Sequence, residues 1–158
     1  MNFRLPIALC TLIYSMINGQ INPDLIDIVR DAYGIPHIFA ATDAEVSYGL
    51  AWAHAEDDFA TIQQGYLAGN NMLSKNIGNA GLGADFIAQF IGSEELFNSR
   101  YENEISAEYK KVVDGYAVGL NSYATSHPEE VLVKELFPIT PKKNDAIRTI
   151  TIIYFFKR

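Results

Sequence analysis

Residues 43–69 read DAEVSYGLAWAHAEDDFATIQQGYLAG, and this stretch decides the fold. At about 100° per residue, its apolar side chains repeat with the period of one long α-helix. The stripe expected to face the core consists of Tyr48, Trp52, Ala55, Phe59, Ile62 and Tyr66. A second apolar face consists of Val46, Leu50, Ala53 and Ala60. Two apolar faces predict a helix that is packed on both sides.

Asp57 lies near the middle of the second apolar face. A carboxylate among apolar neighbours must be paired or hydrogen-bonded to stay ionised. The nearest candidate partners in sequence are Arg30, His37 and the turn backbone around Gly34. A structural carboxylate that ties the preceding loop to the helix is the favoured interpretation, because structural ion pairs also perturb carboxylates. A place in a functional site is the alternative.

The stretch that precedes the helix, RDAYGIPHIFA at residues 30–40, predicts a β-hairpin. Residues 27–30 alternate as a short strand, and Gly34 permits the positive φ of a turn after Tyr33. Pro36 holds the preceding residue extended, so residues 36–40 form the second strand. We interpret His37 as a packed or hydrogen-bonded loop residue rather than a catalytic base. Thr42 or Asp43 is expected to cap the long helix.

The remainder of the chain predicts further short helices. Expected elements are helices at 84–91, 94–104, 107–126 and within 128–136, a helix start at Thr140-Pro141, a flexible glycine-rich connection at 78–83, and a strand at 146–158. Ser106 is the expected cap of the helix that ends at His127-Pro128, and His127 is expected to be exposed. The fold class predicted is mainly α with a short N-terminal β-hairpin.

Residues 1–19 have the pattern of a secretory signal peptide: Arg4, then an uncharged apolar run over 5–17, then a polar segment. The run is shorter than the roughly 20 apolar residues that span a bilayer. A buried core segment is the alternative interpretation. Cys10 is the single cysteine, so cleavage near Gly19 or Gln20 would leave a chain without disulfides.

Charge limits the expected partners. Arg4 is the only charged residue among the first 19, so residues 20–158 carry 11 basic and 19 acidic side chains, a net charge of −8. This balance argues against nucleic acid or anionic lipid as a partner. The sequence contains no HExxH, CxxC, DxDxDG or GxSxG pattern, and His54 and Glu56 are two residues apart, so they do not share a helical face as metal ligands.

RDAYGIPHIFA followed by YGLAWAHAEDDFATIQ closely resembles the opening of the penicillin acylase family. The HAEDD form and the downstream LFPITP resemble the acyl-homoserine-lactone and aculeacin acylase branch most closely. The resemblance covers about residues 25–142, and its motif residues are Arg30, Tyr33, Gly34, Pro36, His37 and Asp57. As a joint pattern, the two segments are more specific than either one alone.

The resemblance implies a secreted or periplasmic hydrolase that cleaves an acylated amide of small-molecule size. Family members are cut into a smaller helical α-chain and a larger β-chain within a four-layer αββα fold. The N-terminal Ser of the β-chain is their nucleophile, and its own α-amine is the base. A calcium ion is possible in the complete family enzyme, bound mainly by β-chain carboxylates. This chain matches the first part of the α-chain, so its expected partner is a β-chain.

No nucleophile, base, oxyanion donor or metal ligand can be carried over to this chain, and the acyl-pocket residues are unknown. Its serines all lie in the expected signal, in helices or at helix edges: Ser15, Ser47, Ser74, Ser93, Ser99, Ser106, Ser122 and Ser126. From Asn144 onward the chain is expected to leave the family's course, which would fit a truncated or frameshifted reading frame. Residues 20–158 are then expected to be a partial α-chain region that is truncated at its C-terminus. The first hypothesis is an inactive N-terminal acylase fragment. The second is a secreted, non-catalytic helical binding protein on an acylase-like scaffold.

Overall fold

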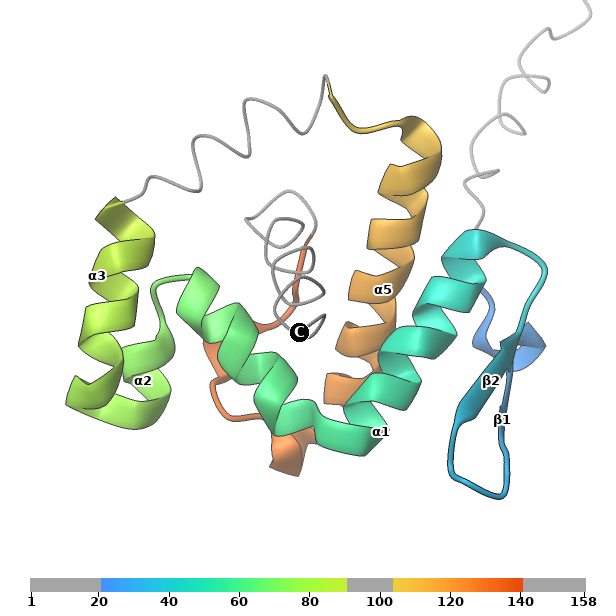
Figure 1. Cartoon of the computed structure of the whole chain (residues 1–158), viewed down its shortest axis with the longest axis horizontal. Coiled ribbons are helices and arrows are strands. Elements are labelled where there is room, and N and C mark those ends of the chain that lie inside the picture. Colours follow the sequence, from blue (N-terminus) through green and yellow to red (C-terminus); the bar gives the residue numbers. More distant parts are fainter. Residues whose placement is uncertain (1–20, 91–103, 141–158) are drawn as a thin grey trace, which may run out of the picture.

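The computed structural model describes residues 21–90 and 104–140, and Figure 1 shows their arrangement. The elements are β1 (Asp27–Arg30), β2 (Pro36–Phe39), α1 (Asp43–Gly69), α2 (Leu73–Ile77), α3 (Leu82–Phe90) and α5 (Ala107–Ser126). Single 3₁₀ turns lie at Pro23–Leu25, Gly78–Gly81, Pro128–Glu130 and Lys134–Leu136. The predicted fold class, mainly α with a short β-hairpin, is confirmed.

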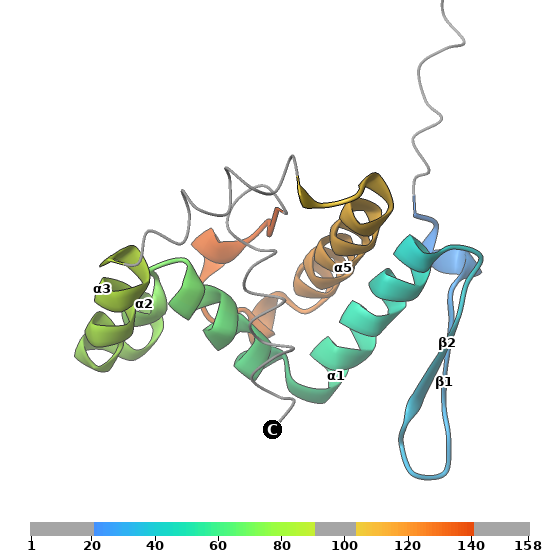
Figure 2. The same ribbon diagram turned by 45° about the horizontal axis from the view of Figure 1, so that its top comes forward.

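The hairpin forms at one end of the α1–α5 pair, whereas α2 and α3 lie at the other end (Figure 2). β1 and β2 are antiparallel, with Ile28 opposite Ile38. Gly34 has φ +81°, the left-handed conformation that the sequence required. Asp31 fixes the turn, since its Oδ1 accepts hydrogen bonds from the backbone N–H groups of Tyr33 and Ile35 at 2.9 Å each.

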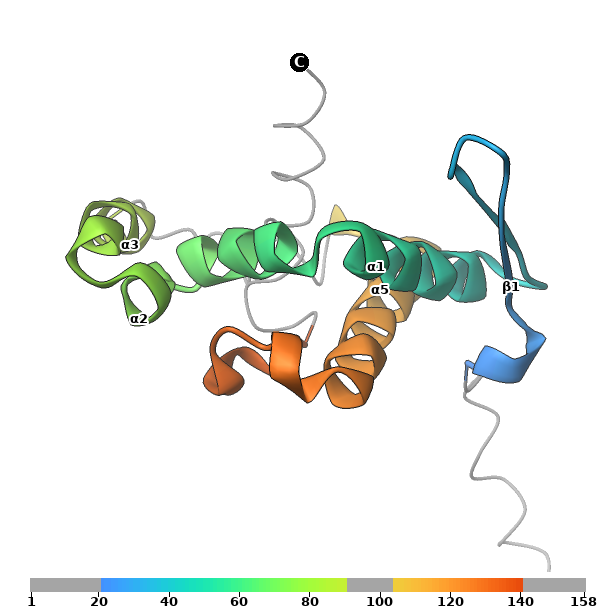
Figure 3. The same cartoon turned by 90° about the horizontal axis from the view of Figure 1, so that it is seen from below.

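α1 begins with a capping box. The Thr42 hydroxyl accepts from the Glu45 N–H, and the Glu45 carboxylate accepts from the Thr42 N–H. The helix is not continuous as predicted, because Asp58 has φ −161° and ψ 74° and interrupts it. The Asp58 Oδ1 accepts from the Thr61 N–H at 3.0 Å, so Asp58 caps the start of the second half of α1. Figure 3 shows the two halves of α1 joined at this bend.

The core lies mainly between α1 and α5. The buried members of the predicted α1 stripe are Tyr48, Ala55, Phe59 and Tyr66, with Trp52 and Ile62 half-buried against them. On α5, Ser106 caps the helix as predicted, and Leu120 and Tyr123 are buried. The two backbones approach closely at Gly115 and Gly119: a Cβ at Gly119 would lie 2.5 Å from the carbonyl oxygen of Tyr48. Only glycine permits this crossing.

The prediction that α1 is packed on both sides is wrong for the described part of the chain. Ala53 is buried, but Val46 and Leu50 are each 37% exposed, and Ala60 is exposed as well. The hairpin covers this side of α1 around Gly49, where a Cβ would lie 2.7 Å from the Ile38 Cγ2. Val46, Leu50 and Ala60 are therefore open to solvent in the described structure.

Two side-chain amides, of buried Gln63 and half-buried Asn121, hold the segment after α5 against the helices. The Gln63 side chain is fully buried, donates to Glu130 O at 2.9 Å and accepts from the Leu132 N–H at 2.8 Å. The Asn121 side chain donates to Ile139 O at 2.8 Å and accepts from the Ile139 N–H at 2.7 Å. Where a helix was predicted within 128–136, the chain forms two separate 3₁₀ turns that these amides anchor.

The glycine-rich segment 78–83 is not the flexible connection that the sequence predicted. It forms a 3₁₀ turn and the start of α3, and Gly81 is buried against the backbone of Leu73 and Ser74. Asp85 of α3 accepts from the N–H groups of both residues, at 2.8 and 2.9 Å, and so caps α2. The predicted signal peptide, most of the 94–104 helix, Pro141 and the 146–158 strand lie outside the described residues.

No helix in residues 21–90 or 104–140 has both the length and the apolar character needed to cross a membrane.

Candidate functional site

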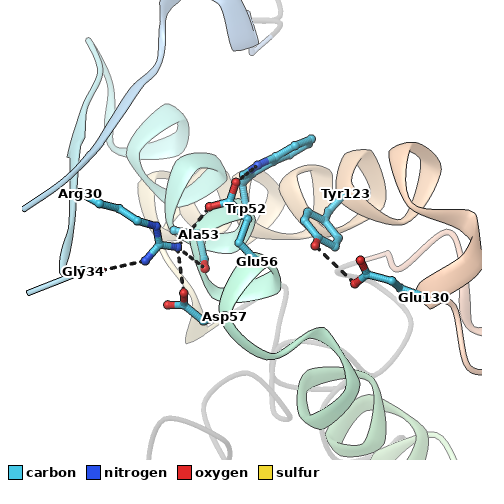
Figure 4. A network of polar contacts seen from close by, with 8 residues as sticks. All are labelled: Arg30, Gly34, Trp52, Ala53, Glu56, Asp57, Tyr123 and Glu130. Atoms are coloured by element: carbon cyan, nitrogen blue, oxygen red, sulfur yellow. Dashed lines mark hydrogen bonds and ion pairs between the residues drawn. The ribbon is translucent and has the colours of Figure 1, made fainter.

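The guanidinium of Arg30, at the end of β1, joins the hairpin to the first half of α1 (Figure 4). Its Nη1 donates to Gly34 O at 2.9 Å, which closes the turn of the hairpin. Its Nη2 reaches α1, with Ala53 O at 3.3 Å, Glu56 Oε2 at 3.1 Å and Asp57 Oδ1 at 2.9 Å. We name Arg30, Glu56 and Asp57 the Arg30 cluster.

Position and charge explain why Arg30 can hold this geometry. Glu56 and Asp57 lie in the last turn before the interruption at Asp58, and Ala53 directly precedes that turn; the end of a helix presents carbonyl groups and attracts cations. Hydrogen bonds that Arg30 donates to the Glu56 and Asp57 carboxylates raise the pKa of Arg30, so the guanidinium remains charged. Arg30 thus acts as a cap for the first half of α1 while it ties down the hairpin.

Asp57 pairs with Arg30, the first partner that the sequence indicated, but it is not buried. Its side chain is 56% exposed, because the apolar face around it is open in the described part. Glu56 is bonded to both Arg30 and Trp52. The spacing of Trp52 and Glu56, four residues apart on a helix, is the signal that indicates this contact.

The motif residues do not all meet. Gly34 reaches the Arg30 cluster through its carbonyl, whereas the Tyr33 side chain is 90% exposed and half-buried Pro36 belongs to β2. The His37 Nε2 lies 3.5 Å from Asp31 Oδ2, so His37 is hydrogen-bonded as predicted, but it lies on β2 and not in a loop. Backbone hydrogen bonds, first from Ile35, lower the pKa of Asp31 despite some desolvation.

Aromatic rings connect the Arg30 cluster to α5. The Trp52 Nε1 donates to Glu56 Oε1 at 3.0 Å, and its ring meets Tyr123 edge to face at 5.3 Å. The Tyr123 hydroxyl lies 3.4 Å from Glu130 Oε2 (Figure 4). Burial and then the Glu130 charge raise the pKa of Tyr123. His127 stacks on Tyr123 at 4.1 Å and is half-buried, so the prediction that it is exposed is wrong.

His54 and Tyr116 form a second polar contact between α1 and α5. The His54 Nδ1 lies 3.1 Å from the Tyr116 hydroxyl. Burial raises the pKa of Tyr116 to about 12 and lowers the pKa of His54. At neutral pH both groups are therefore uncharged, and the contact is a neutral hydrogen bond.

An open groove of about 780 Å³ runs beside the Arg30 cluster. Its lining comes from the segment before and within β1, from α1 and from α5: Pro23, Ile26, Ile28, Tyr48, Trp52, Glu56, Val118, Asn121, Ser122, Thr125 and Ser126. We name it the Trp52 groove. Its floor is mainly apolar and aromatic, and among the described residues that line it Glu56 alone is charged.

Several hydroxyl and carboxylate groups of the described residues take part in structural hydrogen bonds and ion pairs. In residues 21–90 and 104–140, no three His, Cys, Asp or Glu side chains are placed to hold a metal ion, so these segments offer no cage that fits calcium. The Ser106 hydroxyl caps α5, and the Ser126 hydroxyl donates to Ser122 O. In the Arg30 cluster, the Arg30 guanidinium binds the carboxylates of both Glu56 and Asp57.

Most of the chain is similar to known proteins. The family model described as Penicillin amidase matches residues 26–155. Acyl-homoserine lactone acylase PvdQ of Pseudomonas fluorescens (strain Pf0-1) is 25% identical over 117 residues, which are 69% of this chain and 15% of that protein. Penicillin acylase 2 proenzyme of Pseudomonas sp. (strain SE83) is 26% identical, over 63% of this chain and 13% of its own length. Penicillin G acylase of Escherichia coli is 28% identical, over 75% and 14% respectively.

The fold is also similar to that of a solved protein, a thermostable penicillin G acylase from Alcaligenes faecalis. The TM-score is 0.56 at 22% sequence identity, over 72% of this chain and 58% of that chain. The match of the family model to residue 155 contradicts the expectation that the chain leaves the family from Asn144 onward. The chain spans about one seventh of the length of the curated relatives it matches.

Proposed function

Because this chain belongs to the penicillin amidase family, we propose that it forms the N-terminal, mostly helical part of an amide hydrolase of the penicillin or acyl-homoserine-lactone acylase type. The observation that carries the proposal is the family match over residues 26–155, on an acylase-like scaffold. The two segments that carry the family resemblance are also the ones that Arg30 joins, through Gly34 and Asp57.

In this proposal the reaction takes place on polypeptide outside this chain. An N-terminal Ser hydroxyl attacks the amide carbonyl, its α-amine takes the proton, the amine product leaves, and water then hydrolyses the acyl ester. The role of this chain is structural: the Arg30 cluster fixes the hairpin and the bend of α1, which present a common surface to the reactive part. The paired state of both carboxylates in the Arg30 cluster supports this division.

The proposed partner is a β-chain. The chain covers 58% of the solved relative's chain but only 13–15% of the curated relatives, one of which is named a proenzyme. The solved chain is therefore much shorter than those curated proteins, as expected for an enzyme that is cut into pieces. Calcium, if the complete enzyme binds it, would be held by carboxylates of the β-chain.

The test is a hydrolysis assay on N-acylated amides, phenylacetyl and long-chain acyl amides among them. The purified 158-residue chain is assayed alone, and again after co-expression with the polypeptide encoded directly downstream. The chain alone should release no amine from these substrates, whereas the co-expressed pair should release it. Turnover by the purified chain alone would overturn it.

We also propose that the protein is exported, on the basis of the apolar segment that follows Arg4. Expression in a Gram-negative host followed by N-terminal sequencing of the periplasmic fraction checks this. The expected new N-terminus lies near Gly19 or Gln20. A chain that retains Met1 and stays in the cytoplasm would contradict export.

A non-catalytic binding protein on the same scaffold is the second candidate. The observation in its favour is that the described part buries its own core and satisfies the buried amide of Gln63 internally. A monodisperse chain that unfolds cooperatively without any β-chain supports this candidate. Aggregation or rapid proteolysis of the isolated chain supports the fragment of a larger enzyme.

A further inference from the structure

The Trp52 groove has the dimensions of a small-molecule site. Its volume of about 780 Å³ lies within the usual range of such sites. Ile26, Ile28 and Val118 supply apolar walls, and Tyr48 and Trp52 supply aromatic ones. An apolar body of one ring or a short alkyl chain would therefore lose contact with water on entering it.

Several polar side chains along this groove present hydrogen-bond acceptors. The Thr125 hydroxyl donates its proton to Asn121 O at 2.8 Å, and the Ser126 hydroxyl donates to Ser122 O at 3.0 Å. Toward a ligand, both hydroxyl oxygens can therefore only accept hydrogen bonds. The Asn121 side chain already donates to Ile139 O and accepts from the Ile139 N–H. Among these lining groups, the hydroxyls of Ser122 and Tyr48 can either donate or accept.

Glu56 gives the groove its charge. Its two oxygens accept from Trp52 and Arg30, and a carboxylate offers about four lone-pair sites, so accepting capacity remains. Arg30 does not cancel the charge of Glu56, because Arg30 also pairs with Asp57 and the Arg30 cluster keeps a net charge of −1. A ligand that only donates hydrogen bonds and carries positive charge would match this wall.

The aromatic side chains favour the same kind of ligand. The rings of Tyr48 and Trp52 are nearly parallel, 19° apart, with centroids 6.5 Å apart. The faces of such rings attract ammonium groups. We propose that the Trp52 groove binds a small primary ammonium compound with an aromatic or alkyl body. This site goes beyond the proposed function and does not depend on it.

Trp52 is the only tryptophan of the chain, so its fluorescence reports binding in this groove directly. The full 158-residue chain is titrated with 2-phenylethylammonium at about 0.15 M salt, where attraction to distant surface charges is largely screened. Two control ligands separate the contributions: 3-phenylpropanoate has the same body with a negative head, and ethylammonium has the head without the ring. We expect saturable binding of the first and binding at least about tenfold weaker for both controls.

Two variants test whether the ligand binds in the Trp52 groove. Glu56→Gln keeps the size of the side chain but removes the charge, and should weaken 2-phenylethylammonium binding by at least about fivefold. Val118→Lys puts a competing cation on the opposite wall of the groove and should abolish binding; Val118 is 44% exposed, so this change is compatible with folding. Val46→Lys is the matched control, since Val46 is also exposed and does not line the groove.

The result that supports the site is saturable binding that Val118→Lys removes and Val46→Lys leaves intact. Three results would overturn it: equal affinity for the carboxylate control, unchanged affinity in both groove variants, or no saturable signal by either fluorescence or calorimetry. If Glu56→Gln fails to fold, Val118→Lys and the ligand controls still decide the question.

Discussion

Replacing Gly119 by alanine tests the helix crossing that builds the core. A Cβ at this position would lie 2.5 Å from Tyr48 O, 2.8 Å from the Ala51 Cβ and 3.2 Å from the Tyr48 carbonyl carbon. Ordinary contacts begin at about 3.4 Å. Because the obstacle is backbone rather than a flexible side-chain end, α1 and α5 must separate by close to 1 Å.

The size of the effect follows from two opposing contributions. Overpacking a core costs about 1–3 kcal/mol. Moving α1 and α5 apart also weakens the dispersion contacts along the helix pair, so we expect a cost at the upper end of this range. Alanine stabilises a helix interior by about 1 kcal/mol relative to glycine. The net loss expected for Gly119→Ala is therefore about 2 kcal/mol, or roughly 5–8 °C in Tm for a chain of this length.

Urea unfolding followed by far-ultraviolet circular dichroism and by Trp52 fluorescence measures this loss. Gly83→Ala is the matched control, because it is also helical and a Cβ there meets nothing within 4 Å. It should leave stability unchanged or raise it by a few tenths of a kcal/mol. If Gly119→Ala stabilises the chain as much as Gly83→Ala does, the close crossing of α1 and α5 is refuted.

Three further changes test other contacts. Gln63→Leu removes the partner of Glu130 O and of the Leu132 N–H, two part-buried groups, and should cost about 2–4 kcal/mol in chemical unfolding; a midpoint equal to the parent's would contradict this. Burial raises the pKa of Asp85, but hydrogen bonds from Ser74 and Leu73 outweigh it and lower the pKa. The stabilisation by ionised Asp85 is thus present at pH above the pKa of the unfolded state and is lost as the pH falls through the pKa of the folded state. Asp85→Ala should therefore cost about 1–3 kcal/mol at neutral pH. Burial lowers the pKa of His54 below 6.5, so the unfolded chain binds more protons and stability should decline below about pH 6.5; an equally steep decline in His54→Gln would count against this cause.

The helices and the hairpin follow from the sequence because local rules determine them. Thr42 and Ser106 are caps with a known chemistry, Gly34 is the residue that a positive φ requires, and the α1 stripe has clear helical spacing. These features depend on neighbours within about four residues, which a sequence shows directly.

The errors come from contacts between distant segments. Asp57 was expected to be buried because its helical neighbours are apolar, but the described segments cover that face only in part, and the Asp57 side chain is 56% exposed. The interruption at Asp58 has no strong sequence signal, since aspartate is tolerated within helices and serves as a cap only once Thr61 turns toward it. The Trp52 groove was missed for the same reason: its walls come from three elements far apart in sequence.

If Arg30 joins the hairpin to α1 as described, Arg30 and Asp57 must be coupled in stability, and a double-mutant cycle measures this directly. Arg30→Gln and Asp57→Asn are each expected to lower the urea midpoint of the full chain. In the Arg30→Gln background, Asp57→Asn should have no further effect, since its partner is already absent. Losses that simply add in the double variant would contradict the joining role of Arg30.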